Sequence, residues 1–187
     1  MAWPDISYGK IWGRKLLITG DVRTGKTRMT RNILEITVAS APGEITVIDM
    51  APRAVTVNGL PVGGTLMREG EFDARLLRSE PIVTPRLSAR TGAELFELAE
   101  INRHAIQELL DAFHAKPSRI LFVNDVSIYL QRGNLESLWT AFELAETVIA
   151  NGYIGESLRE DLWTGISSRE RRLMKALARR MDQVIRL

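Results

Sequence analysis

The segment Lys15–Thr27 has the sequence KLLITGDVRTGKT, and it decides the fold. Its first five residues are mostly apolar and end at Gly20, which is typical of a short buried strand. The rest matches the pattern Gly-x-x-x-x-Gly-Lys-Ser/Thr, in which successive backbone N–H groups form a concavity that fits phosphate oxygens. The glycines allow the tight curl, and a following helix adds its positive N-terminal end. The segment therefore predicts a strand, a phosphate-binding loop and a helix, in that order.

Individual residues of this loop have expected roles. We expect Lys26 to reach the β- and γ-phosphates of a nucleoside triphosphate, and the Thr27 hydroxyl to bind magnesium. The residues expected to bind the nucleotide are Gly20, Asp21, Val22, Arg23, Thr24, Gly25, Lys26, Thr27 and Arg28. The sequence thus predicts ATP or GTP as the ligand and Mg²⁺ as the cofactor.

Composition narrows the class of protein. The chain has 187 residues, of which 45% are hydrophobic and 26% charged, as in ordinary globular proteins, and we expect one domain over residues 1–187. No apolar run approaches the ~18–20 residues of a membrane helix, and the start lacks the features of a signal peptide, so we expect a cytoplasmic protein without membrane contact. The absence of cysteine excludes disulfides and thiolate metal sites. A net charge of +2 does not by itself predict nucleic-acid binding.

Strand-like and helix-like stretches alternate along most of the chain. We expect strands at residues 15–19, 44–49, 119–125, 147–150 and 184–187, although the fourth could be a continuation of the preceding helix. Between them, helices are expected at about 26–39, from a Thr91 capping box to Pro117, from Asn134, and from a second capping box at 167–170 to about Met181. Crossover helices imply parallel strands. The fold class expected is a three-layer α/β sandwich with a mainly parallel sheet of about five strands.

Residues 51–90 interrupt this alternation with four prolines and four glycines. Within them, residues 55–57 and 60–62 flank Asn58-Gly59, a dipeptide that favours a tight hairpin turn. Pro61 cannot donate a ladder hydrogen bond, so the hairpin should lie at an edge or outside the main sheet. We treat the segment as an insertion.

Polar residues follow three of the expected strands. Asp49, Asp125 and Asn151 should meet beside the phosphate loop, because ligands bind at the carboxyl ends of parallel strands. We expect Asp125 to support the metal and Asp49 to serve a substrate or a metal-bound water, so that Lys26, Asp125 and Asp49 form the catalytic set. Alternatively, either aspartate caps a loop. Val126 occupies the place of the glutamate that often follows such an aspartate in water-activating ATPases.

Arginines in two polar stretches could close over the γ-phosphate. One stretch contains Arg86 and Arg90, and the other covers residues 155–172. Phosphoryl transfer needs positive charge on the developing oxygens and exclusion of water, so Arg86 and Arg90 are candidates for a mobile lid. The alternative is that each of them is simply solvated on the surface.

The strand, loop and helix resemble those of the P-loop NTPase superfamily. A second similarity, to the adenosylcobinamide kinase family, involves Leu121–Leu130, Val148–Gly155 and Arg169–Leu187. It implies the same topology and a possible small-molecule kinase. This sequence departs from that family, because the strand-end aspartate aligns with Asn124 and the only counterpart of the nucleotide-accepting histidine is His104.

Two functions therefore stay open. One is an enzyme that hydrolyses ATP or GTP, or transfers the γ-phosphoryl group to a small-molecule acceptor. The other is a nucleotide-switched binding protein, in which the 51–90 segment recognises a protein or nucleic-acid partner. The sequence does not fix the acceptor, the partner or the oligomeric state.

Overall fold

A parallel sheet forms the centre of the molecule. The computed structural model describes residues 8–53, 55–57 and 60–187. Six strands lie in the order β5-β2-β6-β7-β1-β8, and every neighbouring pair is parallel. Their bounds are β1 (Lys15–Gly20), β2 (Ile45–Asp49), β5 (Arg75–Arg78), β6 (Ile120–Asn124), β7 (Thr147–Tyr153) and β8 (Gln183–Arg186).

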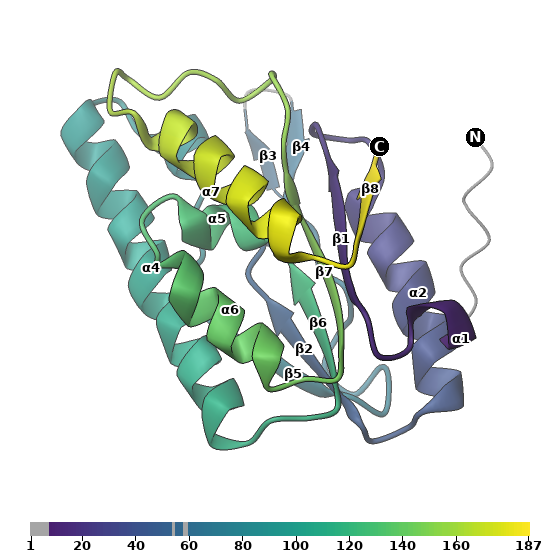
Figure 1. Cartoon of the computed structure of the whole chain (residues 1–187). Coiled ribbons are helices and arrows are strands. Elements are labelled where there is room, and N and C mark those ends of the chain that lie inside the picture. The colour runs from purple at the N-terminus through teal and green to yellow at the C-terminus, as the bar shows by residue number, and fades with distance from the viewer. Residues whose placement is uncertain (1–7, 54, 58–59) are drawn as a thin grey trace.

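Helices cover both faces of this sheet. As Figure 1 shows, α1 and α2 lie on one face, while α4, α5, α6 and α7 pack together on the other. The expected three-layer α/β architecture is therefore confirmed. The helices are α1 (Tyr8–Ile11), α2 (Lys26–Ser40), α3 (Pro85–Ser88), α4 (Gly92–Ala115), α5 (Val126–Leu130), α6 (Leu135–Glu143) and α7 (Ile166–Arg180).

The two faces of the sheet have separate cores. Alternate residues of a strand point to opposite faces, so Val47 packs on the α2 side whereas Ile48 packs on the α4 side. Both are fully buried. A strand covered on both faces is continuously apolar, which is why β2 and β6 were recognisable from sequence.

Helix α4 has the expected N-terminal cap. The Thr91 side chain accepts a hydrogen bond from the Glu94 amide at 3.1 Å, and the Glu94 carboxylate accepts one from the Arg90 amide at 2.7 Å. Leu95, Ile106 and Phe113 lie on its fully buried stripe. This local chemistry fixes where the longest helix of the described chain begins.

The structure corrects the expectations in three places, besides adding the short helices α1, α3 and α5. The sheet has a sixth strand, β5, inside the segment treated as an insertion; it is short, half-buried and begins and ends with arginine, so its sequence does not resemble a core strand. Strand β7 does not stop at Asn151-Gly152 but runs through to Tyr153, paired with β1. The capping box expected at 167–170 is wrong, because α7 has already begun at Ile166.

The expected hairpin is present outside the main sheet. Strands β3 (Val55–Val57) and β4 (Leu60–Val62) pair antiparallel as a separate two-stranded sheet. Asn58 and Gly59, the predicted turn, lie outside the described residues. Within the described part of the chain, no helix is both long and apolar enough to cross a membrane.

Candidate functional site at the carboxyl ends of the strands

The Gly20–Thr27 loop joins β1 to α2, as expected. A side chain at Gly20 would come within 2.7 Å of the Leu187 carbonyl oxygen, so the backbone there excludes any larger residue. Arg23 and Gly25 have positive φ angles of 59° and 94°, which lie in the left-handed region and curl the loop. Gly25 is the N-cap of α2, so the free amides of the first helical turn open toward the loop.

Lys26 is folded back onto its own loop. Its Nζ donates to the Asp21 carbonyl oxygen at 2.5 Å, and the Thr24 hydroxyl donates to the same oxygen at 3.0 Å. Burial lowers the pKa of Lys26, while the charges of Asp125 and Asp21 act in the opposite direction. A phosphate group would provide this partly desolvated ammonium with a stronger partner than a carbonyl.

A cavity of about 510 Å³ lies over this loop. Its volume is in the range of small-molecule sites. The walls come from the loop, from the ends of β6 and β7, and from α3. Among the residues expected to act on a nucleotide, those that line it are Val22, Arg23, Thr24, Gly25, Lys26, Thr27, Arg28, Arg86 and Asp125.

Asp125 lies at this cavity, directly after β6. It adopts a left-handed conformation with φ 58° and ψ 57°, which is uncommon outside glycine. Its Oδ1 accepts a hydrogen bond from the Ser127 hydroxyl at 2.5 Å. Burial raises the pKa of Asp125, against the effects of Ser127, Lys26 and Arg86. The carboxylate and the Thr27 hydroxyl are both oxygen donors on the same cavity, the kind of ligand that magnesium prefers.

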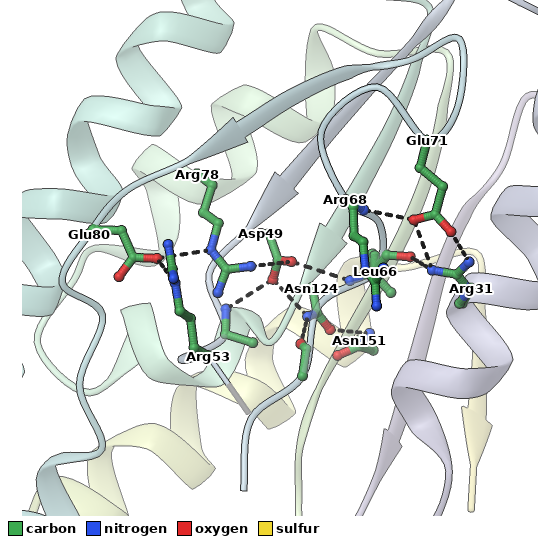
Figure 2. Close-up of polar contacts among 12 residues, drawn as sticks. Arg31, Asp49, Arg53, Leu66, Arg68, Glu71, Arg78, Glu80, Asn124 and Asn151 are labelled. Atoms are coloured by element: carbon green, nitrogen blue, oxygen red, sulfur yellow. Dashed lines mark hydrogen bonds and ion pairs between the residues drawn. The ribbon is translucent and has the colours of Figure 1, made fainter. Parts of the chain in front are cut away.

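Asp49 has a different environment. It is fully buried, and it does not line the cavity. Its Oδ1 accepts from Asn124 Nδ2 at 2.8 Å and from the Ala51 amide at 3.3 Å, while its Oδ2 accepts from the Leu66 amide at 3.2 Å. Arg78 on β5 lies 3.5 Å from Oδ2. Figure 2 shows this arginine beside the carboxylate. Both oxygens are therefore occupied by protein donors, in a network that joins β2 to the 51–90 segment.

Two asparagines connect this network to the cavity. Asn151 Nδ2 donates to Asn124 Oδ1 at 3.0 Å and to Thr30 Oγ1 at 2.9 Å, and its Oδ1 accepts from the Asp125 amide at 3.0 Å. Asn151 thus lies between the phosphate loop helix and the Asp125 backbone. It was expected to end a strand, but it lies within β7.

Arg86 lies in the wall of the cavity and is almost completely buried. Its side chain is 7% exposed, and its NH2 forms an ion pair with Glu170 Oε2 at 3.1 Å. It also donates to the Leu158 carbonyl at 3.0 Å, and its guanidinium lies 5.3 Å from the centre of the Tyr153 ring. Arg86 is therefore held in place, not free to move as a lid residue. Arg90 is exposed and does not line the cavity.

Glu170 is the residue that the sequence interpretation missed. It was expected to cap α7, but it points into the protein with a side chain that is 2% exposed. Gln131 Nε2 donates to its Oε2 at 2.8 Å. Burial raises the pKa of Glu170 to about 7, although Arg86 and Gln131 oppose the shift. No sequence signal singles out Glu170, because a glutamate near a helix start is usually solvated.

Asp21, inside the phosphate loop, faces away from the cavity toward the chain that follows β7. Its Oδ2 accepts from the Glu156 and Ser157 amides at 2.9 and 3.2 Å. Burial acts to raise its pKa, but hydrogen bonds from Val22 and Ser157 and the charge of Lys26 hold it below the usual value. A side chain at Gly155 would approach the Asp21 carboxyl carbon to 2.4 Å. The phosphate loop is thereby fastened to the segment 155–157.

Comparison with known proteins gives little beyond this geometry. No model of a known protein family matches the chain, and no curated protein matches it. Among solved structures, the chain is similar to the Pif1 helicase from Candida albicans, with 14% identity and a TM-score of 0.42. The match covers 94% of this chain and 36% of the helicase chain, so the protein corresponds to little more than a third of that length. The class is defined by its own features: a parallel α/β sheet with a Gly20–Thr27 loop between β1 and α2, compatible with a P-loop NTPase fold.

Proposed function

We propose that this protein binds a nucleoside triphosphate with Mg²⁺ in the cavity over the Gly20–Thr27 loop, and that it acts as a nucleoside triphosphatase or a small-molecule kinase. One observation carries the proposal: three separate parts of the chain, contributing Lys26 and Thr27, Arg86, and Asp125, line the same cavity. The loop amides would hold the phosphates, and Lys26 would exchange the Asp21 carbonyl for phosphate oxygens.

The residues present fit a magnesium ion. Thr27 and Asp125 offer a hydroxyl and a carboxylate, and the described chain has no cluster of three or more His, Asp or Glu side chains that would hold a metal without the nucleotide. Magnesium bound here would neutralise charge on the phosphate oxygens. Asp49 takes no part in this proposal, because its oxygens are already bound by protein donors.

Catalysis in this site would depend on position and charge. Arg86 is held by Glu170 and Leu158 at the cavity wall, so it would meet a phosphate in a fixed orientation. Val126 follows Asp125, so no carboxylate adjoins it as a base for water. We therefore expect slow basal hydrolysis, accelerated by an acceptor whose hydroxyl replaces water.

The test is nucleotide binding by calorimetry at one salt concentration. Lys26→Ala should weaken ATP or GTP binding by about tenfold or more, because an ammonium–phosphate contact in a partly buried loop is lost. Folding should be largely unaffected. Lys175→Ala, at an exposed position of α7, is the matched control and should bind like the parent. Equal affinities of Lys26→Ala and the parent would refute the assignment of the loop.

A nucleotide-dependent switch is the second candidate, favoured by the contact between Asp21 and residues 156–157. The same segment leads to Trp163, a residue that is fully exposed. A change at the phosphate loop could therefore reach an exposed aromatic surface. The fluorescence of Trp163 is obtained by subtracting the spectrum of Trp163→Phe from that of the parent. For a switch, this Trp163 signal should change between the diphosphate and triphosphate states. The same signal in both states would argue against a switch.

A further inference from the structure

A second cavity lies on the helical face of the sheet that carries α4–α7. It measures about 560 Å³ and opens between α4, the turn from α5 to α6, and α7, which pack side by side in Figure 1. None of its lining residues lines the cavity over the Gly20–Thr27 loop. Four arginines line it, namely Arg103, Arg132, Arg169 and Arg172.

Two of these arginines share one acidic partner. Arg103 and Arg132 approach Glu100 at 2.5 and 3.3 Å respectively. The single carboxylate in the lining, Glu136, is engaged by Arg180 at 2.5 Å. The four lining arginines and Arg180 therefore face only Glu100 and Glu136 in this group of side chains, and positive charge is in excess.

The other two arginines have no carboxylate partner among the described residues. Arg169 NH2 donates to the Gly133 carbonyl at 2.7 Å, and its Nε is buried without any hydrogen-bond partner in the described chain. Arg172 lies one turn further along α7 and is exposed. A buried guanidinium nitrogen without a partner costs free energy, and an anion at this position would supply the missing acceptor.

We propose that this cavity is a second anion site that binds a small phosphorylated ligand. Guanidinium groups from three elements surround it, and their planar donors match phosphate oxygens. Its volume is that of a small-molecule site, and its wall is mostly polar, which suits a phosphate ester better than an apolar ligand. The site does not depend on the proposed nucleotide cavity, although Arg132 and Arg169 directly adjoin Gln131 and Glu170 in the chain.

The proposal is tested by titrating inorganic pyrophosphate into the 187-residue Lys26→Ala protein, in which we expect binding at the phosphate loop to be weakened. Adding Arg172→Gln should raise the dissociation constant by about tenfold, and Arg169→Gln should do the same by removing another charge-assisted donor. Because Arg172 is exposed, its substitution does not threaten folding. Arg179→Gln is the matched control: an exposed arginine of the same helix that does not line the cavity. It should change the affinity less than twofold.

Two outcomes would overturn the proposal. One is a pyrophosphate affinity that is unaffected by both cavity substitutions, or reduced equally by Arg179→Gln. The other is binding of a single-stranded oligonucleotide through Arg172 when pyrophosphate does not bind. That result would identify an extended phosphate backbone as the ligand instead of a small molecule.

Discussion

Asp49 and Asp125 occupy equivalent places in the chain, yet they have different surroundings. Asp49 is the last residue of the buried strand β2, Asp125 directly follows the buried strand β6, and the two strands are neighbours in the sheet. Asp49 accepts three hydrogen bonds from protein donors and lies 3.5 Å from Arg78. Asp125 has one side-chain hydrogen bond, from Ser127, and lines the cavity.

The difference arises from what packs against each strand end. At β2, the 51–90 segment brings the Leu66 amide and Arg78 to the carboxylate. At β6, the neighbouring strand β7 provides Asn151, which accepts a hydrogen bond from the Asp125 amide, but the Asp125 carboxylate still faces the cavity. The position of an aspartate at a strand end is therefore not enough to make it a ligand. It can bind a metal or a substrate only if its carboxylate oxygens are not already bound by protein donors.

The largest effect expected is on stability, at Asp49. Asp49→Ala should lower the free energy of unfolding by about 3–5 kcal/mol, because it leaves the buried Ala51 and Leu66 amides without acceptors and removes the buried carboxylate beside Arg78. Urea unfolding of the purified protein measures this. Asp73→Ala, at an exposed aspartate, should change stability by no more than about 0.5 kcal/mol. A small loss for Asp49→Ala would show that this network is not structural.

The next effect concerns turnover, at Asp125. Asp125→Asn should reduce turnover by about 10²-fold and weaken the magnesium dependence of binding, because a carboxylate near the metal is lost. Binding of nucleotide without metal should change little. Asp49→Asn should reduce turnover per folded molecule much less, as determined by single-turnover assays of both variants. If Asp49→Asn gives the larger loss, the roles assigned to the two carboxylates are reversed.

The third prediction compares Arg86, which lies in the cavity wall, with Arg90, which is exposed outside it. Arg86→Ala should lower the stimulated rate by about tenfold or more with a smaller effect on nucleotide affinity, since a fixed guanidinium acts mainly on the transition state. Arg90→Ala, at an exposed position outside the cavity, should have little effect. Rates and affinities measured on the same preparations separate the two. Comparable rate losses for both variants would contradict the structural distinction.

A separate effect is expected on the pH dependence of stability, from Glu170. Its pKa is about 7 in the folded protein and near the ordinary value of 4.5 when unfolded, so the folded state binds this proton more tightly. The contribution of Glu170 is therefore greatest below about pH 4.5 and is lost as the pH rises to about 7. The difference in unfolding free energy between the parent and Glu170→Gln should fall over this window. A constant difference would mean that Glu170 stays ionised.

Much of the fold could be predicted because its signals are local. The five expected strands are all present, and the caps at Thr91 and Asn134 form as expected. Strand β5 was missed because its pattern, Arg-Leu-Leu-Arg, is too short and too polar to identify without knowing that β2 needs a neighbour. The end of β7 was misplaced because Gly152 usually breaks strands, whereas here it leaves room for Met174, which a side chain would approach to 2.6 Å.

The site was predicted less completely, since it depends on contacts between distant residues. The Gly20–Thr27 loop is contiguous, so its motif could be recognised directly. The pair of Arg86 and Glu170 joins residues 84 positions apart, and no sequence motif relates the two residues to each other. The burial of Asp49 likewise depends on Leu66 and Arg78, in a segment whose path the sequence did not reveal.

Strand β7 lies between β1 and β6, and this order sets the width of the site. Adjacent strands are about 4.8 Å apart, so the loop after β1 and Asp125 after β6 start about 10 Å from each other. That distance leaves room for phosphate groups and a hydrated cation between Lys26 and the carboxylate. If β1 and β6 were adjacent strands, the two side chains would instead form an ion pair and close this space. Asn151, within the intervening strand β7, is uncharged, so it neither repels the phosphates nor competes for the metal. The order of the strands thus keeps two opposite charges apart until a ligand joins them.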